Sequence, residues 1–237
     1  MSPLLTLPLL RVEPVTPRAR LLTLDLGGSS LAYRPGQAVM AGLHGQAVRR
    51  PYSIACSPGR AAARSALELL VGVNASGSAG PHLTPLTPGA AIDIEGPMGA
   101  FTLPEQVATS DLLFVGGGTG IAPLRAMIDH AVAEGAARRL VLFYSARQPD
   151  EFAFIDELRA HEHAGHLELH QTVTRESAGW PGRTGRIDRD QLRAALREPE
   201  GTLCFVCGPA AMVEEGVDAL ARLGVPDDAI RTEWRRR

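Results

Sequence analysis

The chain has 237 residues, of which 45 % are hydrophobic and 21 % are charged, and its formal net charge is −2. This composition is typical of a soluble globular protein and gives no reason to expect a nucleic-acid partner. The longest apolar runs, such as residues 112–115, are far shorter than the roughly 20 residues of a membrane-spanning helix, and we identify no signal peptide, so we expect a cytoplasmic protein.

Short apolar segments separated by Gly- and Pro-containing turns fill residues 1–104. Strands are expected over residues 7–13, 20–26, 37–43, 50–56, 66–73 and 90–96, with a short helix near 79–86. Short strands at this spacing favour an antiparallel barrel or sandwich.

Strand and helix patterns alternate over residues 105–237. Strands are expected over 111–116, 138–146, 167–174 and 202–208, and helices over 120–135, 149–161, 189–198 and 209–224. This alternation predicts a parallel sheet with right-handed crossovers. We therefore expect two domains, 1–104 and 105–237, that meet in the loop 101–110.

The three cysteines are Cys56, Cys204 and Cys207. They are too few for a disulfide framework or for a plant-type iron–sulfur cluster. Cys204 and Cys207 form a C-x2-C pair, but the pair lies in an apolar run typical of a buried strand, and no second pair completes a zinc site. We expect no metal. All 24 basic residues are Arg, which excludes a Lys-based Schiff base or phosphate loop.

The first segment that indicates chemistry is Arg50-Pro51-Tyr52-Ser53, inside an expected strand. Alternate side chains of a strand share a face. An Arg can pair with a phosphate, an aromatic ring can stack on a planar ring, and a hydroxyl can bond a ring nitrogen. These groups suit a flavin nucleotide, although an ordinary barrel strand with an exposed Arg has the same pattern.

Three glycine-containing turns carry the remaining signals. Residues 77–81 precede a short helical stretch, where small residues expose backbone N–H groups to an anion such as a pyrophosphate. Residues 115–123, VGGGTGIAP, join a strand to a helix and allow close approach of a phosphate. Residues 207–212, CGPAAM, form another strand-to-helix turn. Its thiol suits a place beside a nicotinamide, or a buried structural position.

The order and spacing of R-P-Y-S, G-T-G-I-A-P and C-G-P-A-A-M resemble the ferredoxin–NADP reductase superfamily. Residues 96–101, GPMGAF, are similar to the G-P-x-G-x-F of that family's domain junction. The resemblance covers nearly the whole chain. It implies an N-terminal six-stranded antiparallel flavin-binding barrel followed by a parallel α/β pyridine-nucleotide domain.

The resemblance also implies residue roles. Arg50 would hold the flavin phosphate, Tyr52 would stack on the isoalloxazine and Ser53 would bond its N5. Cys207 would lie near the nicotinamide C4, and Glu233 is a candidate proton donor near Ser53. The implied FAD site comprises Arg50, Pro51, Tyr52, Ser53, Val71, Val73, Gly80, Thr119 and Trp234. The implied NADP site comprises Gly117, Gly118, Thr119, Gly120, Pro123, Arg147, Thr174, Arg175, Arg186, Cys207, Gly208 and Met212.

Two departures from the family pattern affect the flavin. Gly80 stands where many members have a Ser or Thr on the pyrophosphate. This departure removes one hydroxyl contact and leaves backbone N–H groups, so FMN stays open as the alternative to the FAD that the resemblance implies. Trp234 comes one residue earlier than the aromatic residue that covers the flavin in many members, and three Arg follow it. Trp234 either stacks on the flavin or packs on the sheet.

The choice of nucleotide depends on residues near the adenosine ribose. Thr174-Arg175-Glu176 followed by Gly185-Arg186-Ile187 resembles the S-R-E and G-R-I of bacterial NADP-using members, in which two Arg clamp the 2′-phosphate. NAD-using oxygenase reductases have a stretch similar to residues 180–187, W-P-G-R-T-G-R-I. NADP(H) is favoured over NAD(H).

The implied function is an FAD-dependent oxidoreductase that passes electrons from NAD(P)H to a separate one-electron acceptor, such as ferredoxin, flavodoxin, or an oxygenase or haem component. One alternative is an NADH-dependent reductase component of a multicomponent oxygenase. Another is a flavin electron-transfer subunit that receives electrons from a partner chain. The sequence leaves the acceptor and the oligomeric state open.

Overall fold

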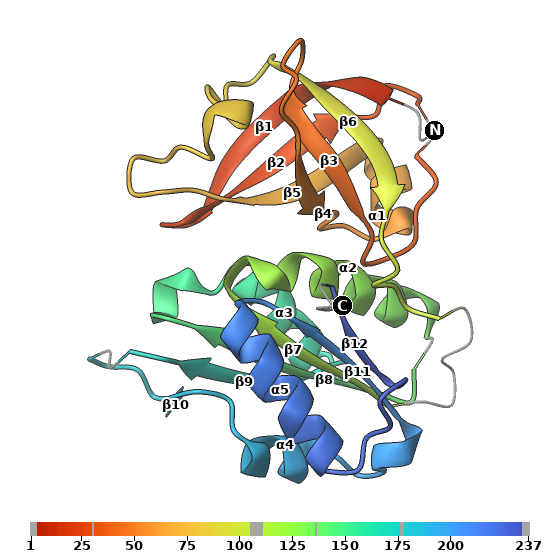
Figure 1. Ribbon diagram of the computed structural model, residues 1–237, viewed down its shortest axis with the longest axis vertical. Helices are drawn as coiled ribbons and strands as arrows, with labels where there is room; N and C mark the ends of the chain where they lie inside the picture. The colour runs from red at the N-terminus through yellow and green to blue at the C-terminus, as the bar shows by residue number, and fades with distance from the viewer. Residues whose placement is uncertain (1–3, 30, 105–110, 136, 176–177, 234–237) are drawn as a thin grey trace.

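Two structural units follow each other along the chain, an all-strand unit and an α/β unit, and they lie one above the other in Figure 1. The computed structural model describes the whole chain except residues 1–3, 30, 105–110, 136, 176–177 and 234–237. The expected boundary between residues 104 and 105 falls between the last strand of the first unit and the first strand of the second. The exact boundary stays a prediction.

The first unit is a six-stranded antiparallel sheet in the order β4-β3-β6-β1-β2-β5. A bridge between Ile54 and Leu69 joins its two edges, and the Ala55 amide donates to the Glu68 carbonyl at 2.8 Å, which closes the sheet into a barrel. The elements are β1 (Leu4–Thr16), β2 (Ala19–Asp25), β3 (Ala38–Leu43), β4 (Arg50–Ser53), α1 (Pro58–Arg64), β5 (Ala66–Gly72), a 3-10 helix (Pro81–Leu83) and β6 (Ala91–Met98).

Two local predictions for this unit are corrected. The helix expected near residues 79–86 is only the three-residue 3-10 helix Pro81–Leu83. Residues 57–60, one of the Gly- and Pro-containing segments expected to be turns between strands, are instead the start of α1. The Ser57 hydroxyl accepts a hydrogen bond from the Arg60 amide, and Pro58 occupies the first helical turn. A Ser followed by Pro is a helix-start signal that sequence reasoning could have used.

The second unit is a six-stranded parallel sheet in the order β10-β9-β8-β7-β11-β12. Figure 1 shows it below the barrel, with helices on both faces. Its elements are β7 (Asp111–Gly117), α2 (Ile121–Glu134), β8 (Arg139–Ala146), α3 (Ile155–His163), β9 (Glu168–Val173), β10 (Arg183–Thr184), α4 (Arg189–Ala195), β11 (Thr202–Cys207), α5 (Ala210–Arg222) and β12 (Ile230–Thr232).

Alternation along the central strands divides the core of this unit into two layers. Phe114 and Phe205 pack with residues of α2 and α3 on the side toward the barrel. Cys204 and Val206 pack with residues of α4 and α5 on the opposite side. Cys207 belongs to the layer toward the barrel, so the two cysteines of the C-x2-C pair point to opposite faces of the sheet.

The helix expected over residues 149–161 begins later than predicted. A 3-10 turn covers Pro149–Glu151, and Phe154 has a φ of 60°, so α3 starts at Ile155. The strands β10 and β12 are short edge strands that the sequence pattern did not indicate. Among the described residues, no helix has the length and apolarity needed to cross a membrane.

A buried network of charges connects the two units. Arg125 of α2 is 4 % exposed and donates to the Glu68 carboxylate of β5 at 2.6 Å, to the Ala55 carbonyl at 2.7 Å and to Glu157 of α3 at 2.8 and 2.9 Å. Arg60 of α1 donates to Glu157 and, at 2.7 and 3.0 Å, to Asp129 of α2. The barrel and the α/β unit are therefore held together by hydrogen-bonded ion pairs.

Candidate functional site

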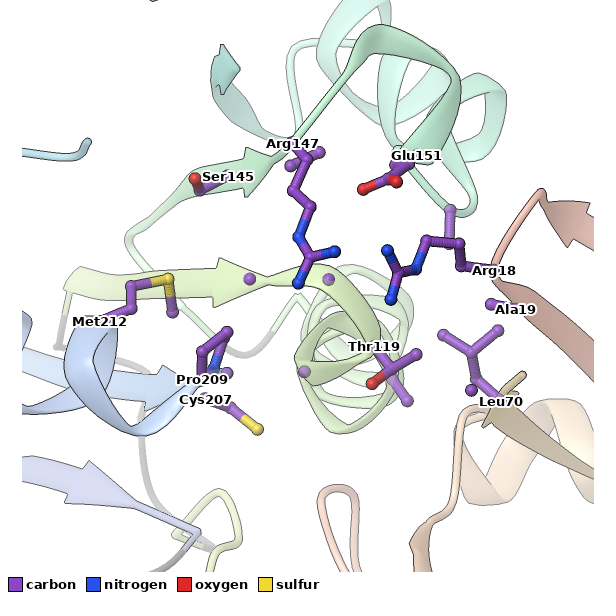
Figure 2. A pocket seen from close by; sticks show the side chains of 18 of the residues that line it. Arg18, Ala19, Leu70, Thr119, Ser145, Arg147, Glu151, Cys207, Pro209 and Met212 are labelled. Carbon is purple, nitrogen blue, oxygen red and sulfur yellow. The ribbon is translucent and has the colours of Figure 1, made fainter. Parts of the chain in front are cut away.

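A cavity of about 1360 Å³ lies between the two units. It exceeds the roughly 300–1,000 Å³ of a usual small-molecule pocket, so it has room for more than one ligand. Figure 2 shows side chains from both units that point into it. Its walls include the ends of β4 and β5 from the barrel and the carboxyl ends of β7, β8 and β11 from the parallel sheet, where ligands bind in open α/β folds.

The turn after β7 lies directly against the end of β11. A Cβ atom placed on Gly120 would lie 2.4 Å from the carbonyl oxygen of Cys207, so only glycine allows this approach. Gly118 has a φ of +55°, and a Cβ there would meet nothing within 4 Å. At Gly117, Gly118 and Gly120 this segment thus presents backbone without a side chain to the cavity, and Thr119 adds its side chain (Figure 2).

One carboxylate joins both units at the cavity wall. The Ser53 hydroxyl at the end of β4 donates to Oε1 of Glu233, which directly follows β12. The Cys207 thiol at the end of β11 donates to Oε2 of Glu233 at 3.1 Å. All three residues line the cavity. The structure therefore brings together the three residues that the family resemblance places around the flavin N5 and the nicotinamide C4 as catalytic candidates.

The electrostatic setting of Cys207 keeps it in the thiol form. Burial raises the pKa of its thiol far above the usual range, and the adjacent Glu233 carboxylate raises that pKa further. A thiolate nucleophile is therefore disfavoured at Cys207. The group is instead a small, uncharged hydrogen-bond donor at the cavity wall.

Tyr52 contacts a histidine that the sequence analysis did not identify. The Tyr52 hydroxyl lies 2.6 Å from Nε2 of His82, and the two rings are stacked with centroids 5.9 Å apart. Burial raises the pKa of Tyr52, although nearby Arg50 acts in the opposite direction. Tyr52 therefore lines the cavity as a neutral phenol.

Arginine side chains surround the other end of the cavity. Arg18, from the turn between β1 and β2, and Arg147, which follows β8, extend into the cavity from opposite sides (Figure 2). Within the described part of the chain, the side chains of Arg18, Arg147 and Arg175 form no hydrogen bond or ion pair, whereas Arg186 pairs with Glu215 of α5. Unpaired guanidinium groups in a cavity suit a phosphate-bearing ligand.

Most of the predicted ligand residues share this one cavity. Those in its wall are Pro51, Tyr52, Ser53, Val73, Gly80, Gly117, Gly118, Thr119, Gly120, Arg147, Thr174, Arg175, Arg186, Cys207, Gly208, Met212 and Glu233. Their individual ligand roles stay predictions.

Four of the predicted residues are not described in this wall. Arg50 is exposed near Tyr52 and His82, outside the cavity wall. Val71 points into the barrel core, because its neighbours Leu70 and Gly72 face the cavity. Pro123 is buried in the first turn of α2. Trp234 lies outside the described residues.

Sequence reasoning missed Arg18, His82 and Glu151 in or beside this wall. Arg18 and Glu151 carry no motif, and only the fold brings them to the cavity. The Ser78 hydroxyl accepts a hydrogen bond from the Gly80 amide at 3.1 Å, so a hydroxyl is present two residues before Gly80. Ser78 belongs to the segment 77–81, which the sequence indicated as an anion site through its backbone N–H groups and not through this hydroxyl.

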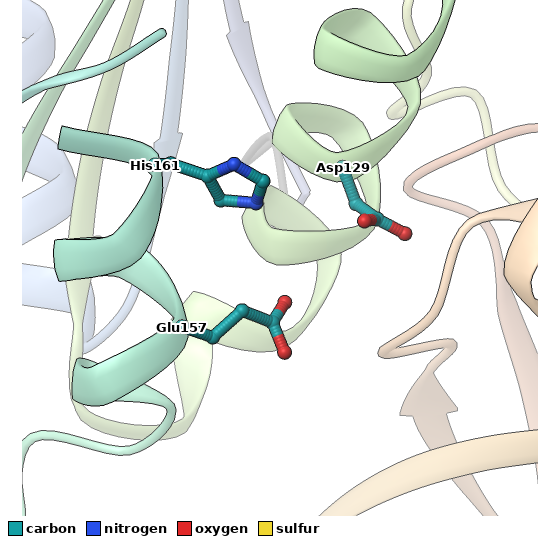
Figure 3. Close-up of side chains that lie close together, drawn as sticks. All are labelled: Asp129, Glu157 and His161. Atoms are coloured by element: carbon teal, nitrogen blue, oxygen red, sulfur yellow. The ribbon is translucent and has the colours of Figure 1, made fainter. Parts of the chain in front are cut away.

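A second cluster, of Asp129, Glu157 and His161, lies outside the cavity (Figure 3). Its ligand atoms lie within 4.8 Å of one another. Both carboxylates are already bonded by arginines, Asp129 by Arg60 and Glu157 by Arg60 and Arg125. Hence we assign these carboxylates to the network between the two units rather than to a metal.

The groups around the cavity fit a flavin nucleotide together with a pyridine nucleotide. An aromatic ring, two hydroxyls, a bare glycine turn and unpaired guanidiniums face the same space. Such groups can stack on a planar ring, bond ring nitrogens and hold phosphates. These groups, together with the volume of the cavity, suit the binding of both nucleotides.

Comparisons with known proteins agree with this assignment. Residues 6–103 match the family model described as an oxidoreductase FAD-binding domain, and residues 114–217 match the oxidoreductase NAD-binding domain. Ferredoxin–NADP reductase B of Sorangium cellulosum is 33 % identical over 238 residues, covering 95 % of both chains. Cytochrome b5 reductase 4 of Danio rerio is 30 % identical over 237 residues, but the match spans only 45 % of that relative.

Solved structures give the same result for the fold. The Amycolatopsis cytochrome P450 reductase GcoB superposes with a TM-score of 0.84 at 27 % identity, over 98 % of this chain and 70 % of its own. A ferredoxin NADP+ reductase from Neisseria gonorrhoeae superposes with a TM-score of 0.80 over 98 % and 99 % of the two chains, at 22 % identity. With both domains matched and a full-length relative in the family, the chain belongs to the ferredoxin–NADP reductase superfamily of FAD- and pyridine-nucleotide-dependent oxidoreductases.

Proposed function

We propose that this protein takes a hydride from NADPH and passes the electrons one at a time to a separate protein carrier such as ferredoxin or flavodoxin. FAD, when bound, supplies the exchange between two-electron and one-electron chemistry. The observation that carries the proposal is the joint placement of Ser53, Cys207 and Glu233 at the wall of a cavity built by both domains.

The barrel side of the cavity would hold FAD. Tyr52 offers a ring for stacking, and Ser53 offers its hydroxyl oxygen, because the hydroxyl hydrogen is donated to Glu233. Arg50, exposed beside Tyr52, offers a guanidinium for a phosphate. The Gly80 turn and the Ser78 hydroxyl would add contacts to the pyrophosphate, which favours FAD over FMN.

The α/β side would hold the nicotinamide nucleotide. The glycines after β7 leave room for its pyrophosphate, and Cys207 borders the space nearest Ser53 and Glu233. The hydrogen bond from Cys207 to Glu233 orients the thiol without ionising it. Positioning of this kind would align the two reactants for hydride transfer.

Selection of NADPH over NADH would depend on arginines. Arg147, Arg175 and Arg186 are exposed in the cavity wall, and the Arg147 and Arg175 side chains form no hydrogen bond or ion pair among the described residues. Thr174 adds a hydroxyl beside them. A 2′-phosphate would gain charge-assisted hydrogen bonds from these groups that a 2′-hydroxyl would not.

The pairing of Arg186 with Glu215 favours a second candidate, an NADH-dependent reductase component of an oxygenase. Glu215 neutralises one of the two arginines assigned to the 2′-phosphate, and both residues line the cavity. A relative from Ralstonia, 30 % identical over 217 residues, is named as the reductase component of naphthalene 1,2-dioxygenase and salicylate 5-hydroxylase systems.

Anaerobic stopped-flow mixing of the FAD-loaded protein with NADPH and with NADH tests the proposal. Rapid bleaching of the flavin band with NADPH, and slower bleaching with NADH, is the expected result. Faster bleaching with NADH supports the oxygenase-reductase candidate. If neither nucleotide bleaches the band, the protein has no NAD(P)H turnover and receives its electrons from a partner chain.

A further inference from the structure

The histidine beside Tyr52 has an unusual environment. His82 lies in the 3-10 helix Pro81–Leu83, is 2 % exposed and stacks on Tyr52 at an interplanar angle of 14°. Its Nε2 atom lies 2.6 Å from the Tyr52 hydroxyl. Tyr52 lines the cavity, whereas His82 lies behind it. His82 can therefore act on a ligand only through Tyr52.

The other ring nitrogen of His82 is buried without a partner. Nδ1 is shielded from solvent and has no hydrogen bond to any residue that the structure describes. Burial lowers the pKa of His82, and nearby Arg50 lowers it further. The imidazole is therefore neutral at pH 7, and a neutral imidazole carries its one N–H on either Nδ1 or Nε2.

The two tautomers leave different groups unsatisfied. With the proton on Nδ1, a buried N–H donor would have no acceptor, which native structures rarely tolerate. With the proton on Nε2, only a lone pair of Nδ1 is left over, and the Nε2–H donates to the Tyr52 oxygen. The second arrangement leaves the hydroxyl hydrogen of Tyr52 free to point toward the cavity.

We propose that His82 is a positioning residue that donates from Nε2 to the Tyr52 oxygen and so directs the Tyr52 hydroxyl hydrogen to an acceptor oxygen of the ligand. The identity of that ligand as FAD rests on the function proposed above. Its acceptor is an oxygen of the sugar-alcohol chain or of a phosphate. The ring contact also holds the Tyr52 phenol at the stacking position.

Gly80 fits the same arrangement. A Cβ on Gly80 would lie 3.3 Å from both Cε1 and Nδ1 of His82, and Gly80 has a φ of +101°. A larger residue at position 80 would be strained and would crowd the imidazole. Gly80 therefore leaves the space that the His82 imidazole occupies in this arrangement.

The tautomer is the first test, and it needs no turnover. A long-range ¹H–¹⁵N correlation spectrum of the full-length protein as purified distinguishes the two ring nitrogens, and the His82 signals are assigned by their loss in His82→Gln. We expect a neutral ring with the proton on Nε2. A proton on Nδ1, or a charged ring at pH 7, would overturn the proposal.

Substitution of His82 is the second test. Gln places its amide nitrogen at the reach of Nε2, so His82→Gln keeps a donor, whereas His82→Leu removes it. We expect His82→Leu to weaken FAD binding roughly tenfold, the effect of one hydrogen bond, and His82→Gln to stay within about twofold of the parent protein. Flavin fluorescence measures the dissociation constant, and thermal unfolding confirms that each variant is folded.

Two controls make the result specific. His163→Leu, at an exposed position of α3, should leave the dissociation constant unchanged. In a Tyr52→Phe background, the difference between Gln and Leu at position 82 should disappear. Equal losses for Gln and Leu would show that His82 acts by packing alone and overturn the proposal. If the parent protein bound no FAD, the proposed function would fail, while the tautomer would still be measured separately.

Discussion

Among single residues, Glu233 connects the two domains directly at the site, because its carboxylate contacts a residue of each. It accepts one hydrogen bond from a barrel residue, Ser53, and another from a residue of the parallel sheet, Cys207. The family resemblance led us to expect Glu233 near Ser53. It did not indicate that the same carboxylate also holds the Cys207 thiol, because no sequence spacing relates β11 to the residue that follows β12.

A matched pair of cysteine variants separates function from stability. Cys207→Ala removes the thiol beside Glu233, so we expect slower flavin reduction with the flavin still bound. Cys204 is fully buried on the opposite face of the same strand, so Cys204→Ala should lower the melting temperature and leave the reduction rate unchanged. Stopped-flow absorbance and thermal unfolding measure the two effects. An unchanged rate in Cys207→Ala would assign this thiol a purely structural role.

Removal of two arginines tests the choice of nucleotide. We expect Arg175→Ala/Arg186→Ala to lower kcat/KM for NADPH on the order of a hundredfold, because two charge-assisted contacts to the 2′-phosphate are lost. The value for NADH should change little. Steady-state assays with both nucleotides and an artificial acceptor measure the effect. Equal values for the double variant and the parent with NADPH would contradict the proposed clamp.

The secondary-structure elements show where sequence patterns were sufficient. The six barrel strands and the central strands of the parallel sheet were predicted because apolar residues alternate or run continuously through them. The start of α3 was predicted too early, because the apolar pattern continues through Phe152 and Phe154. The backbone of Phe154 is left-handed, and the helix begins after it. The edge strand β10 has two residues, Arg183 and Thr184, and is defined only by pairing with β9.

Substitution of glycine by alanine should change the free energy of unfolding in opposite directions at two positions, Gly120 and Gly59. In Gly120→Ala, the new methyl group would lie against the carbonyl oxygen of Cys207, so the turn after β7 must move. We expect a loss of about 1–3 kcal/mol of unfolding free energy and weaker nucleotide binding. Gly59 of α1 has open space around its Cβ position. Gly59→Ala should therefore stabilise the protein by about 0.4–1 kcal/mol, as denaturant titration can show.

For the whole molecule, the decisive feature is how the two domains are joined. The contact includes Arg125, Glu68, Arg60, Asp129 and Glu157, and it is made of charge pairs and hydrogen bonds. None of these residues belongs to a motif that the sequence analysis recognised. The sequence was sufficient to predict two domains and the motifs that face each other. It was not sufficient to predict their interface, because ion pairs between distant segments leave no periodic signal.

Removal of the Arg125 side chain should lower the free energy of unfolding strongly. Arg125→Met leaves the carboxylate of Glu68 buried, and that side chain is 4 % exposed. We expect the free energy of unfolding to fall by about 3–5 kcal/mol at pH 7, because the buried Glu68 carboxylate loses its main partner. Arg11→Met removes an exposed arginine of β1 that pairs with exposed Glu13 and should change stability little. Chemical denaturation of both variants provides the comparison, and similar small losses would show that the network adds nothing.

The same network predicts acid sensitivity. Burial alone would raise the pKa of Asp129 and Glu157, but hydrogen bonds from arginines outweigh burial and lower both pKa values. Carboxyls with lowered pKa values stabilise the fold above their unfolded-state pKa of about 4, and this contribution disappears as the pH falls through their folded-state values. We expect unfolding free energy to fall below about pH 4. Arg60→Ala should show a smaller fall over the same range.

The ion-pair network between the two domains has a kinetic consequence for nucleotide binding and release. Because Arg125 ties α2 to both β5 and α3, widening of the gap between the domains would separate several ion pairs at once. Nucleotides should therefore enter and leave by diffusion through the existing mouth rather than after a hinge opens. The observed association rate should then rise linearly with nucleotide concentration, without the plateau that a slow opening step imposes.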